Sequence, residues 1–247
     1  MLELVDVEFK RGNFTVGPLS FSLGRGEILS ICGKNGSGKT STLVAANNYI
    51  KLEKGEVNVD GNNIKNMKIN QIATKIAYVQ QEIPEPMGLT VRDIMEIAGY
   101  TRENKEEDIQ KALDLCEMGD SIDRDFATLS GGEKRMVSIA SGIYQNSDYI
   151  LMDEPTSFLD IDKIHLLENI IKSLKKMGKG ILLVLHDINI AINMSDTAIL
   201  MAKGKMVSYG PPDSSITVET LEKTYNTRFG KYDSPEGVRF YPLEYDK

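Results

Sequence analysis

The chain has 247 residues, of which 41% are hydrophobic and 26% charged, enough for one domain, or one domain with a subdomain, around a sizeable core. Its net charge of −7 argues against a dedicated nucleic-acid-binding protein, which would carry a basic patch. The two cysteines, Cys32 and Cys116, lack the spacing of a disulfide or metal motif, so we expect both to be buried apolar residues in a reducing compartment.

The sequence predicts neither a signal peptide nor a membrane-spanning segment. The first ten residues alternate apolar and polar side chains as an edge strand does, without the basic start and apolar core of a signal peptide. The longest apolar runs, such as Ile150–Met152 and Ile181–Leu185, are far shorter than the ~20 residues that span a bilayer. We therefore expect any membrane role to depend on a partner.

The first third of the chain reads as strands followed by one helix. Residues 1–31 predict three strands, and the third, Ile28–Ile31, runs directly into a glycine-rich loop. A helix is expected over Lys39–Ile50 because its pattern begins where that loop ends. Two further strands are expected at Val57–Val59 and Ile76–Val79, joined by a polar segment.

Residues 82–145 differ in character. They begin with a proline-broken linker, Glu82–Gly88, and continue with helical apolar spacing over Thr90–Gly99 and Lys105–Met118. Thr90, followed three residues later by an acid, resembles a helix-starting capping box. We expect this region to be an inserted helical subdomain.

After residue 146, strands and helices alternate again. Strands are expected at Tyr149–Met152 and Ile181–Leu185, and helices at Ile161–Met177 and Ile188–Met194. Short apolar strands that alternate with helices predict an α/β fold with a mostly parallel sheet covered on both faces.

Residues 33–40, GKNGSGKT, match the phosphate-binding loop, two glycines five residues apart followed by Lys and Thr. The glycines permit a tight turn whose N–H groups point at phosphate oxygens, and the next helix directs its positive end at the same anion. Lys39 is expected to bind the β- and γ-phosphates of ATP, and Thr40 to bind Mg²⁺. A plain glycine-rich turn is the alternative, but the position between a strand and a helix favours binding. The expected nucleotide-binding residues are Gly33, Asn35, Gly36, Ser37, Gly38, Lys39, Thr40 and Ser41.

Two acids, Asp153 and Glu154, follow the apolar strand Tyr149–Met152. The carboxyl end of a parallel strand faces the crevice where ligands bind in α/β sheets. We expect Asp153 to hold Mg²⁺, and Glu154 to act as the general base on the water that attacks the γ-phosphate. A solvated strand end is the alternative, which the upstream phosphate loop disfavours.

Residues 129–133, LSGGE, resemble the LSGGQ signature of ABC ATPases, with Glu133 in place of the commoner Gln. A Ser hydroxyl and N–H groups at a helix N-terminus form a second anion site, although an N-cap turn has the same pattern. The other motifs follow in the family's order. Gln81, or the neighbouring Gln80, resembles the Q-loop glutamine, residues 157–160 resemble the D-loop, and His186 resembles the switch histidine.

The resemblance covers essentially the whole chain and implies a RecA-like P-loop NTPase fold with an antiparallel β-subdomain and a helical subdomain. The single domain would comprise a core of residues 1–81 and 146–210, the helical subdomain 82–145 and an extension 211–247. Two units would pair head to tail, so that each ATP lies between one phosphate loop and the partner's signature loop. Phe9 lies about where the family stacks an aromatic on adenine, although a strand Phe is often a core residue. The family's roles would fall on Lys39, Gln81, Glu154 and His186 for catalysis, on Thr40, Gln81 and Asp153 for Mg²⁺, and on Ser130, Gly131, Gly132 and Asp160 for nucleotide contact.

An ABC ATPase can be a transporter subunit, a non-transport ATPase such as a translation factor or an assembly ATPase, or a DNA-repair ATPase. Residues 82–128 leave no room for the coiled coil of a DNA-repair ATPase, and a translation factor would carry two domains and a basic character. An assembly ATPase stays open, as does the ATPase of a transporter for another small solute. The segments 89–93, 153–162 and 185–189 and the tail after Gly210 resemble ATPases of importers for iron–siderophore, haem or cobalamin. That class implies a second copy, membrane permease subunits and, indirectly, a solute-binding protein as partners, a place at the cytoplasmic membrane face, and a linker 82–88 that helps to accept the permease.

Overall fold

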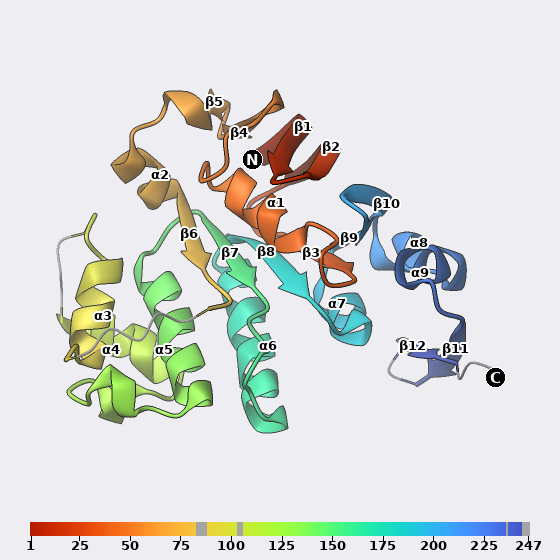
Figure 1. Ribbon diagram of the computed structural model, residues 1–247. Helices are drawn as coiled ribbons and strands as arrows, with labels where there is room; N and C mark the ends of the chain where they lie inside the picture. The colour runs from red at the N-terminus through yellow and green to blue at the C-terminus, as the bar shows by residue number, and fades with distance from the viewer. Residues whose placement is uncertain (83–87, 103–105, 236, 244–247) are drawn as a thin grey trace.

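The computed structural model describes residues 1–82, 88–102, 106–235 and 237–243, and its centre is a six-stranded sheet in the order β10-β9-β3-β8-β7-β6 (Figure 1). β10 joins β9 in antiparallel pairing and the other strands pair in parallel. Every residue of β3, β7 and β8 is buried, as expected for parallel strands covered on both faces. The strands are β3 (Ile28–Gly33), β6 (Ile76–Val79), β7 (Tyr149–Asp153), β8 (Gly180–Leu185), β9 (Thr197–Ala202) and β10 (Lys205–Gly210).

A second, antiparallel sheet of four strands lies over one face of the first, in the order β2-β1-β4-β5. Alternation along β3 separates the two cores: Ile28 and Cys32 belong to one hydrophobic cluster, and Leu29 and Ile31 to the other. The second cluster fills the space between the two sheets and includes α1 (Lys39–Ala46). The strands of the second sheet are β1 (Leu2–Arg11), β2 (Phe14–Leu23), β4 (Lys54–Val59) and β5 (Asn62–Asn63).

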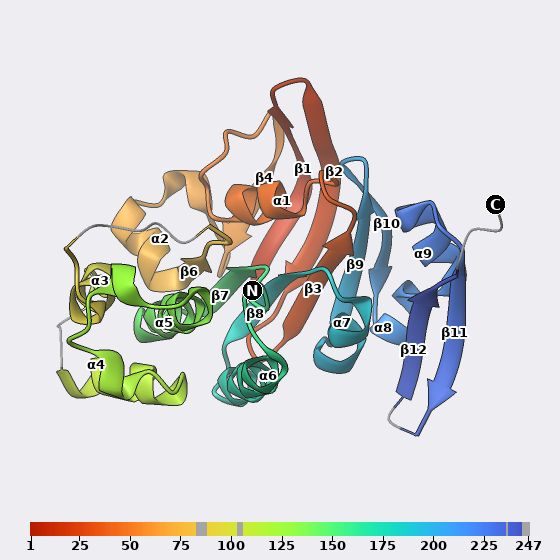
Figure 2. The same ribbon diagram turned by 60° about the horizontal axis from the view of Figure 1, so that its bottom comes forward.

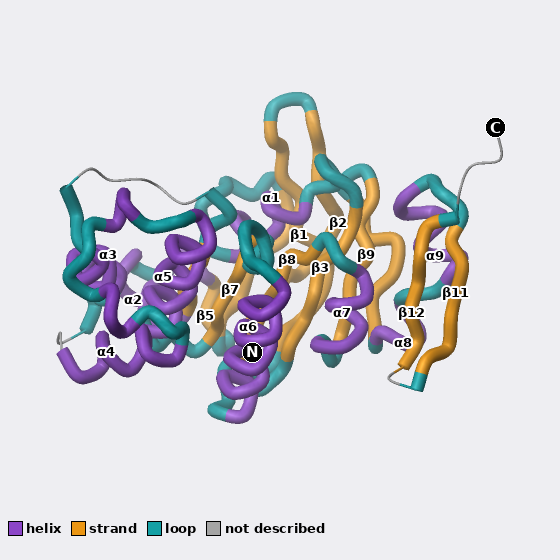
Figure 3. The backbone as a smooth tube through the Cα atoms, turned by 90° about the horizontal axis from the view of Figure 1, so that it is seen from below, coloured by secondary structure: helices purple, strands orange, loops and turns teal. Residues whose placement is uncertain are grey.

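Helices cover the opposite face and extend beyond one edge. Figures 1 and 2 show α3, α4 and α5 together at the β6 side, while the C-terminal elements lie at the other end of the molecule. In Figure 3 the strands of the sheets lie between this helical group and the β11–β12 hairpin. The helices and hairpin strands are α2 (Ile69–Lys75), α3 (Val91–Ala98), α4 (Glu106–Leu115), α5 (Gly131–Tyr144), α6 (Ile161–Lys176), α7 (Ile188–Met194), α8 (Pro212–Ser215), α9 (Val218–Tyr225), β11 (Phe229–Ser234) and β12 (Gly237–Pro242).

The predicted fold class is confirmed: a mostly parallel sheet carries an antiparallel β-subdomain and an inserted helical group. The capping box of α3 is also confirmed, because Thr90 N donates to Asp93 Oδ2 at 2.7 Å and Asp93 N donates to Thr90 Oγ1 at 3.2 Å. Both cysteines are buried and unpaired, and burial raises the pKa of the Cys32 and Cys116 thiols to about 12.

Some expected boundaries were wrong. The helix expected to reach Ile50 ends at Ala46, because Asn47 caps it and Asn48 turns left-handed at φ 61°. The polar segment before β6 contains β5 and α2, and the C-terminal tail contains two helices and a hairpin, none of which was predicted. The predicted linker break falls on residues 83–87, which lie outside the described residues. No helix within the described part of the chain is long and apolar enough to cross a membrane.

Candidate nucleotide site

The phosphate loop joins β3 to α1 and is held tightly against β9. Gly33 has φ 153°, and a Cβ at this position would lie only 2.2 Å from the carbonyl oxygen of Met201, so no larger residue fits. Gly38 precedes α1 at φ 107° and offers no side chain to cap the helix. The first N–H groups of α1 are therefore left without an intrahelical or side-chain acceptor, as an anion site requires.

Lys39, the first residue of α1, folds back over this loop. Its Nζ donates to the carbonyl oxygens of Gly33 at 2.9 Å and Lys34 at 3.2 Å, and the residue is buried. Burial lowers the pKa of Lys39, and the nearby carboxylates of Glu154 and Asp153 raise it in part. A phosphate in the loop would add the counter-charge that two neutral carbonyls do not supply.

Asp153 at the end of β7 faces Thr40. Its Oδ1 accepts from Thr40 Oγ1 at 3.1 Å, while its buried Oδ2 has no hydrogen-bond partner among the described residues. Burial raises the pKa of this carboxyl. An orphaned carboxylate oxygen beside a hydroxyl fits Mg²⁺, which takes one or two protein oxygens and completes its shell with phosphate and water. The described residues hold no cluster of three metal-binding acids, histidines or cysteines.

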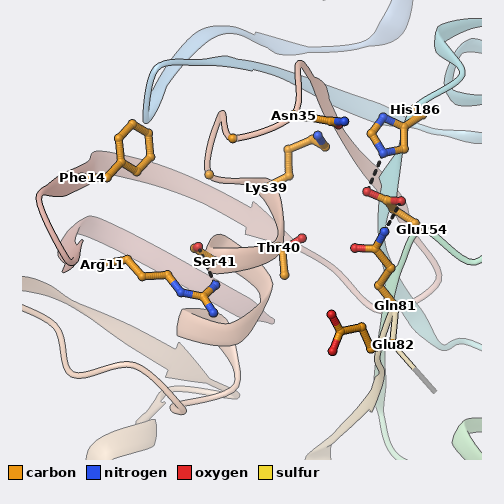
Figure 4. Close-up of a pocket in the computed structure, with 12 residues that line it drawn as sticks. Arg11, Phe14, Asn35, Lys39, Thr40, Ser41, Gln81, Glu82, Glu154 and His186 are labelled. Carbon is orange, nitrogen blue, oxygen red and sulfur yellow. Dashed lines mark hydrogen bonds and ion pairs between the residues drawn. The ribbon is translucent and has the colours of Figure 1, made fainter. Parts of the chain in front are cut away.

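Glu154 is held between two side chains from other strand ends (Figure 4). Gln81 Nε2 donates to its Oε2 at 2.6 Å, and His186 Nε2 lies 2.5 Å from its Oε1. The backbone of Glu154 is left-handed at φ 49°, a conformation that costs a non-glycine residue free energy and is concentrated at functional sites. Gln81 thus meets Glu154, whereas the neighbouring Gln80 does not line the pocket that contains Glu154 and lines two pockets beside it.

One pocket of about 730 Å³ brings these groups together. In Figure 4 the phosphate loop and α1 lie between Glu154 and His186 on one side and Arg11 and Phe14 on the other. An adjoining pocket shares several of these residues and reaches Asp153. The volume is typical of small-molecule sites. The lining residues are Arg11, Phe14, Asn35, Gly36, Gly38, Lys39, Thr40, Ser41, Gln81, Glu82, Glu154 and His186.

The expectation that Phe9 stacks on adenine was wrong. Phe9 is 0% exposed, because β1 has a bulge near Asp6 that shifts its register and moves the later residues Val7 and Phe9 to the core side with Leu2 and Leu4.

Phe14 and Arg11 line the pocket instead. They pair across the β1–β2 turn, and Arg11 Nη1 donates to Ser41 Oγ at 3.3 Å. Their position on both sides of the Gly12 turn is the feature of the sequence that could have indicated this role. No feature of the sequence indicated that Glu82 also lines the pocket.

The signature loop does not join this pocket within one chain. Ser130 caps α5, and the carboxylate of Glu133 accepts from Ser130 N at 2.7 Å and from Arg124 Nη1 at 2.9 Å. These hydrogen bonds lower the pKa of Glu133 to about 2. Gly131 is exposed beside Phe158, whose left-handed backbone belongs to the predicted D-loop.

Asp160, the last residue of that D-loop, is used within its own chain as the cap of α6. Its Oδ1 accepts from Lys163 N at 3.0 Å. Besides the buried Phe9, the predicted site residues that the structure leaves apart from the nucleotide pocket are therefore Ser130, Gly131, Gly132 and Asp160.

The phosphate loop lies at the junction of β3 and α1, and it faces two acids at the end of β7, which is separated from β3 by β8 alone. This arrangement defines a nucleotide-binding ATPase site. The family model described as ABC transporter matches residues 16–157, more than half of the chain. The petrobactin import ATP-binding protein YclP of Bacillus subtilis is 31% identical over 222 residues, which cover 87% of this chain and 88% of that protein. An ABC transporter ATP-binding protein of Clostridium tetani is 34% identical over 213 residues, which cover 85% of this chain but 48% of that longer protein.

A solved structure shows the same fold. A chain from an ABC transporter assigned to the metal-chelate type, in an inward-facing conformation, superposes with a TM-score of 0.85 at 24% identity, over 98% of this chain and 97% of that one. The chain therefore belongs to the ABC transporter family. It is an ATP-binding subunit that hydrolyses ATP.

Proposed function

We propose that the chain powers the import of a metal chelate of the iron–siderophore, haem or cobalamin type, as one of two identical ATPase subunits on the cytoplasmic face of a membrane permease. A solute-binding protein would deliver the chelate to that permease. Support comes from the petrobactin import relative, which matches over most of both lengths, and from the likeness of the whole chain, C-terminal extension included, to a metal-chelate type transporter. We infer that the chain is one domain with the parts expected from the sequence: a core of residues 1–81 and 146–210, a helical subdomain 82–145 and an extension 211–247.

The catalytic part of the proposal rests on Glu154 held between Gln81 and His186 across the pocket from the phosphate loop. Lys39 would bind the β- and γ-phosphates, and Thr40 and Asp153, with Gln81, would hold Mg²⁺, which supplies charge neutralisation when bound. Glu154 would orient and deprotonate the attacking water, and His186 would hold that water at the γ-phosphate. Ser130, Gly131, Gly132 and Asp160 would act on the partner's ATP.

A groove beside the helical group supports docking of a permease. It is lined by residues of the turn after α1, of α2 and β6, and of the loop after α3, and has a volume of about 430 Å³. Tyr49 and Ile69 are each 65% exposed there, and Tyr100 is 55% exposed. Clustered exposed apolar side chains mark protein interaction sites, and a segment of a membrane subunit would cover these. The linker residues 83–87, expected to contribute, are outside the described part of the chain.

Replacement of Glu154 by Gln tests the catalytic proposal. The variant keeps the size and both neighbours of the side chain but removes the base, so it should bind ATP, fail to hydrolyse it and accumulate as an ATP-bound dimer in size-exclusion chromatography. Glu219→Gln, an exposed glutamate on α9, is the matched control and should stay active. Hydrolysis by Glu154→Gln at the wild-type rate would exclude Glu154 as the base.

The cargo is tested in cells of the source organism. Cells that carry Glu154→Gln as their only copy should lose uptake of labelled iron–siderophore, haem or cobalamin while uptake of an amino acid continues. Normal uptake of all three chelates would contradict the importer proposal, and copurification with cytosolic proteins in place of a multi-span permease would favour the assembly ATPase.

A further inference from the structure

An arginine is fully buried in the second turn of α5, the helix that follows the signature loop. Arg135 in α5 is 0% exposed, although a guanidinium is rarely buried without compensating partners. No carboxylate among the described residues lies within ion-pair distance of it. Its partners are two consecutive backbone carbonyls: Nη1 donates to Gln80 O at 2.7 Å and Nη2 donates to Gln81 O.

These carbonyls lie just beyond the paired part of β6. The register of β6 with β7 ends at Val79 and Met152, so the following residues have no strand partner in that ladder. A planar guanidinium that reaches both carbonyls fixes the position and the orientation of the segment, which a single ammonium cannot do. Burial lowers the pKa of Arg135, and the more distant charges of Asp153 and Glu154 raise it in part.

We infer that Arg135 is a positioning residue that sets the side chain of Gln81 against Glu154, and so joins the signature loop of α5 to the catalytic carboxylate of the same chain. Gln81 is the link: its backbone carbonyl accepts a hydrogen bond from Arg135, and its side-chain Nε2 donates to Glu154 at 2.6 Å. Arg135 lies five residues after Ser130 on one continuous helix, so a shift of the signature loop carries the guanidinium with it.

Coupling between two ATP sites follows from this arrangement, and this part rests on the proposed function, in which Ser130 serves the partner's ATP. Closure of the signature loop on one nucleotide would then move Gln81 and Glu154 at the other. A two-state element that both sites bias is what allosteric coupling requires. Loss of Arg135 should therefore lower kcat and reduce the cooperativity of ATP hydrolysis, while ATP binding to the phosphate loop stays intact.

The test compares Arg135→Met and Arg135→Lys with Arg228→Met, an exposed arginine that does not line the nucleotide pocket. We expect Arg135→Met to lower kcat by about tenfold or more with little change in KM, because small misplacements at a catalytic site have effects of this size. The Hill coefficient should fall toward one. Arg135→Lys should recover part of kcat, and Arg228→Met should match the wild type. Unchanged kcat per folded molecule, with only a lowered Tm, would overturn the inference.

A double-mutant cycle with Gln81→Ala covers the case in which Arg135→Met does not fold. If Arg135 acts through Gln81, Arg135→Lys should cause no further loss of kcat in the Gln81→Ala background. Fully additive losses would contradict the inference. Failure of the proposed function would be visible separately, as a wild-type chain that hydrolyses ATP without cooperativity or forms no ATP-dependent dimer, while the cycle would still report on Arg135 and Gln81.

Discussion

Two helices begin at glycine-rich loops, and their first turns are completed in opposite ways. α1 starts after Gly38, which provides no side-chain cap. α5 starts after Ser130, whose hydroxyl accepts from Glu133 N at 3.3 Å while the Glu133 carboxylate accepts from Ser130 N. The N–H groups at the start of α1 are therefore left for a ligand, whereas those of α5 are partly satisfied within the chain.

Their surroundings differ in the same sense. The loop before α1 lies inside a pocket with the buried Lys39, but the loop before α5 lies at the surface, where Gly131 and the 73% exposed Phe158 are neighbours. The first loop can hold a nucleotide within one chain. The second lies outside that pocket, and in the head-to-tail dimer that we propose it would meet the nucleotide of another chain.

The largest effect should come from Lys39→Ala, which removes the buried cation at the start of α1. Loss of one partner from a buried charge pair costs ~2–5 kcal/mol, so ATP affinity should fall about thirtyfold or more. Equilibrium titration with a fluorescent ATP analogue measures this. Lys34→Ala, at an exposed position of the same loop, is the control and should bind nearly as the wild type does.

Ser130→Arg should abolish hydrolysis and leave binding to the isolated chain intact, because the signature loop lies outside the pocket of its own chain. The comparison between the two loops requires this separation. ATP affinity of the variant and its steady-state hydrolysis are measured on the same preparation. A large loss of affinity in the monomer would show that the signature loop belongs to the chain's own site.

Phe14→Ala should have a moderate effect at the far end of the pocket. An aromatic contact is worth ~0.5–1.5 kcal/mol, so the Kd for ATP should rise about fivefold with Tm nearly unchanged. Phe9→Ala is the contrasting variant, since removal of a buried Phe costs ~3–5 kcal/mol of folding free energy. Thermal unfolding and titration of both variants separate the roles; a Phe9 effect on binding at unchanged Tm would restore the original expectation.

The smallest effect concerns Glu133, which completes the α5 loop. Its pKa in the folded chain is lowered to about 2, so its carboxylate adds stability above its ordinary pKa, and this stability is lost as the pH falls toward 2. The advantage of the wild type over Glu133→Gln should be at most about 1 kcal/mol near pH 7, because the group is partly exposed. Urea unfolding between pH 7 and 3 checks this, and an advantage that grows in acid would contradict it.

The sequence predicted the parts of the site whose chemistry requires a particular kind of side chain after a buried strand. Asp153 and Glu154 stand at the end of one strand that is buried throughout, and the loop before Lys39 and Thr40 follows another, so their place at one sheet edge could be inferred. Phe9 could not be placed, because the bulge near Asp6 changes which residues of β1 face the core. Arg135 also gave no signal, since a basic residue in an amphipathic helix is usually solvated and only packing against the end of β6 buries it.

Mixing two inactive variants tests the head-to-tail account most directly. Lys39→Ala retains an intact signature loop and Ser130→Arg retains an intact phosphate loop, so a mixed dimer contains one complete composite site. The account predicts that single-turnover ATP hydrolysis appears on mixing, although neither variant hydrolyses ATP alone. A mixture as inactive as its components, with mixed dimers confirmed by differently tagged chains, would contradict it.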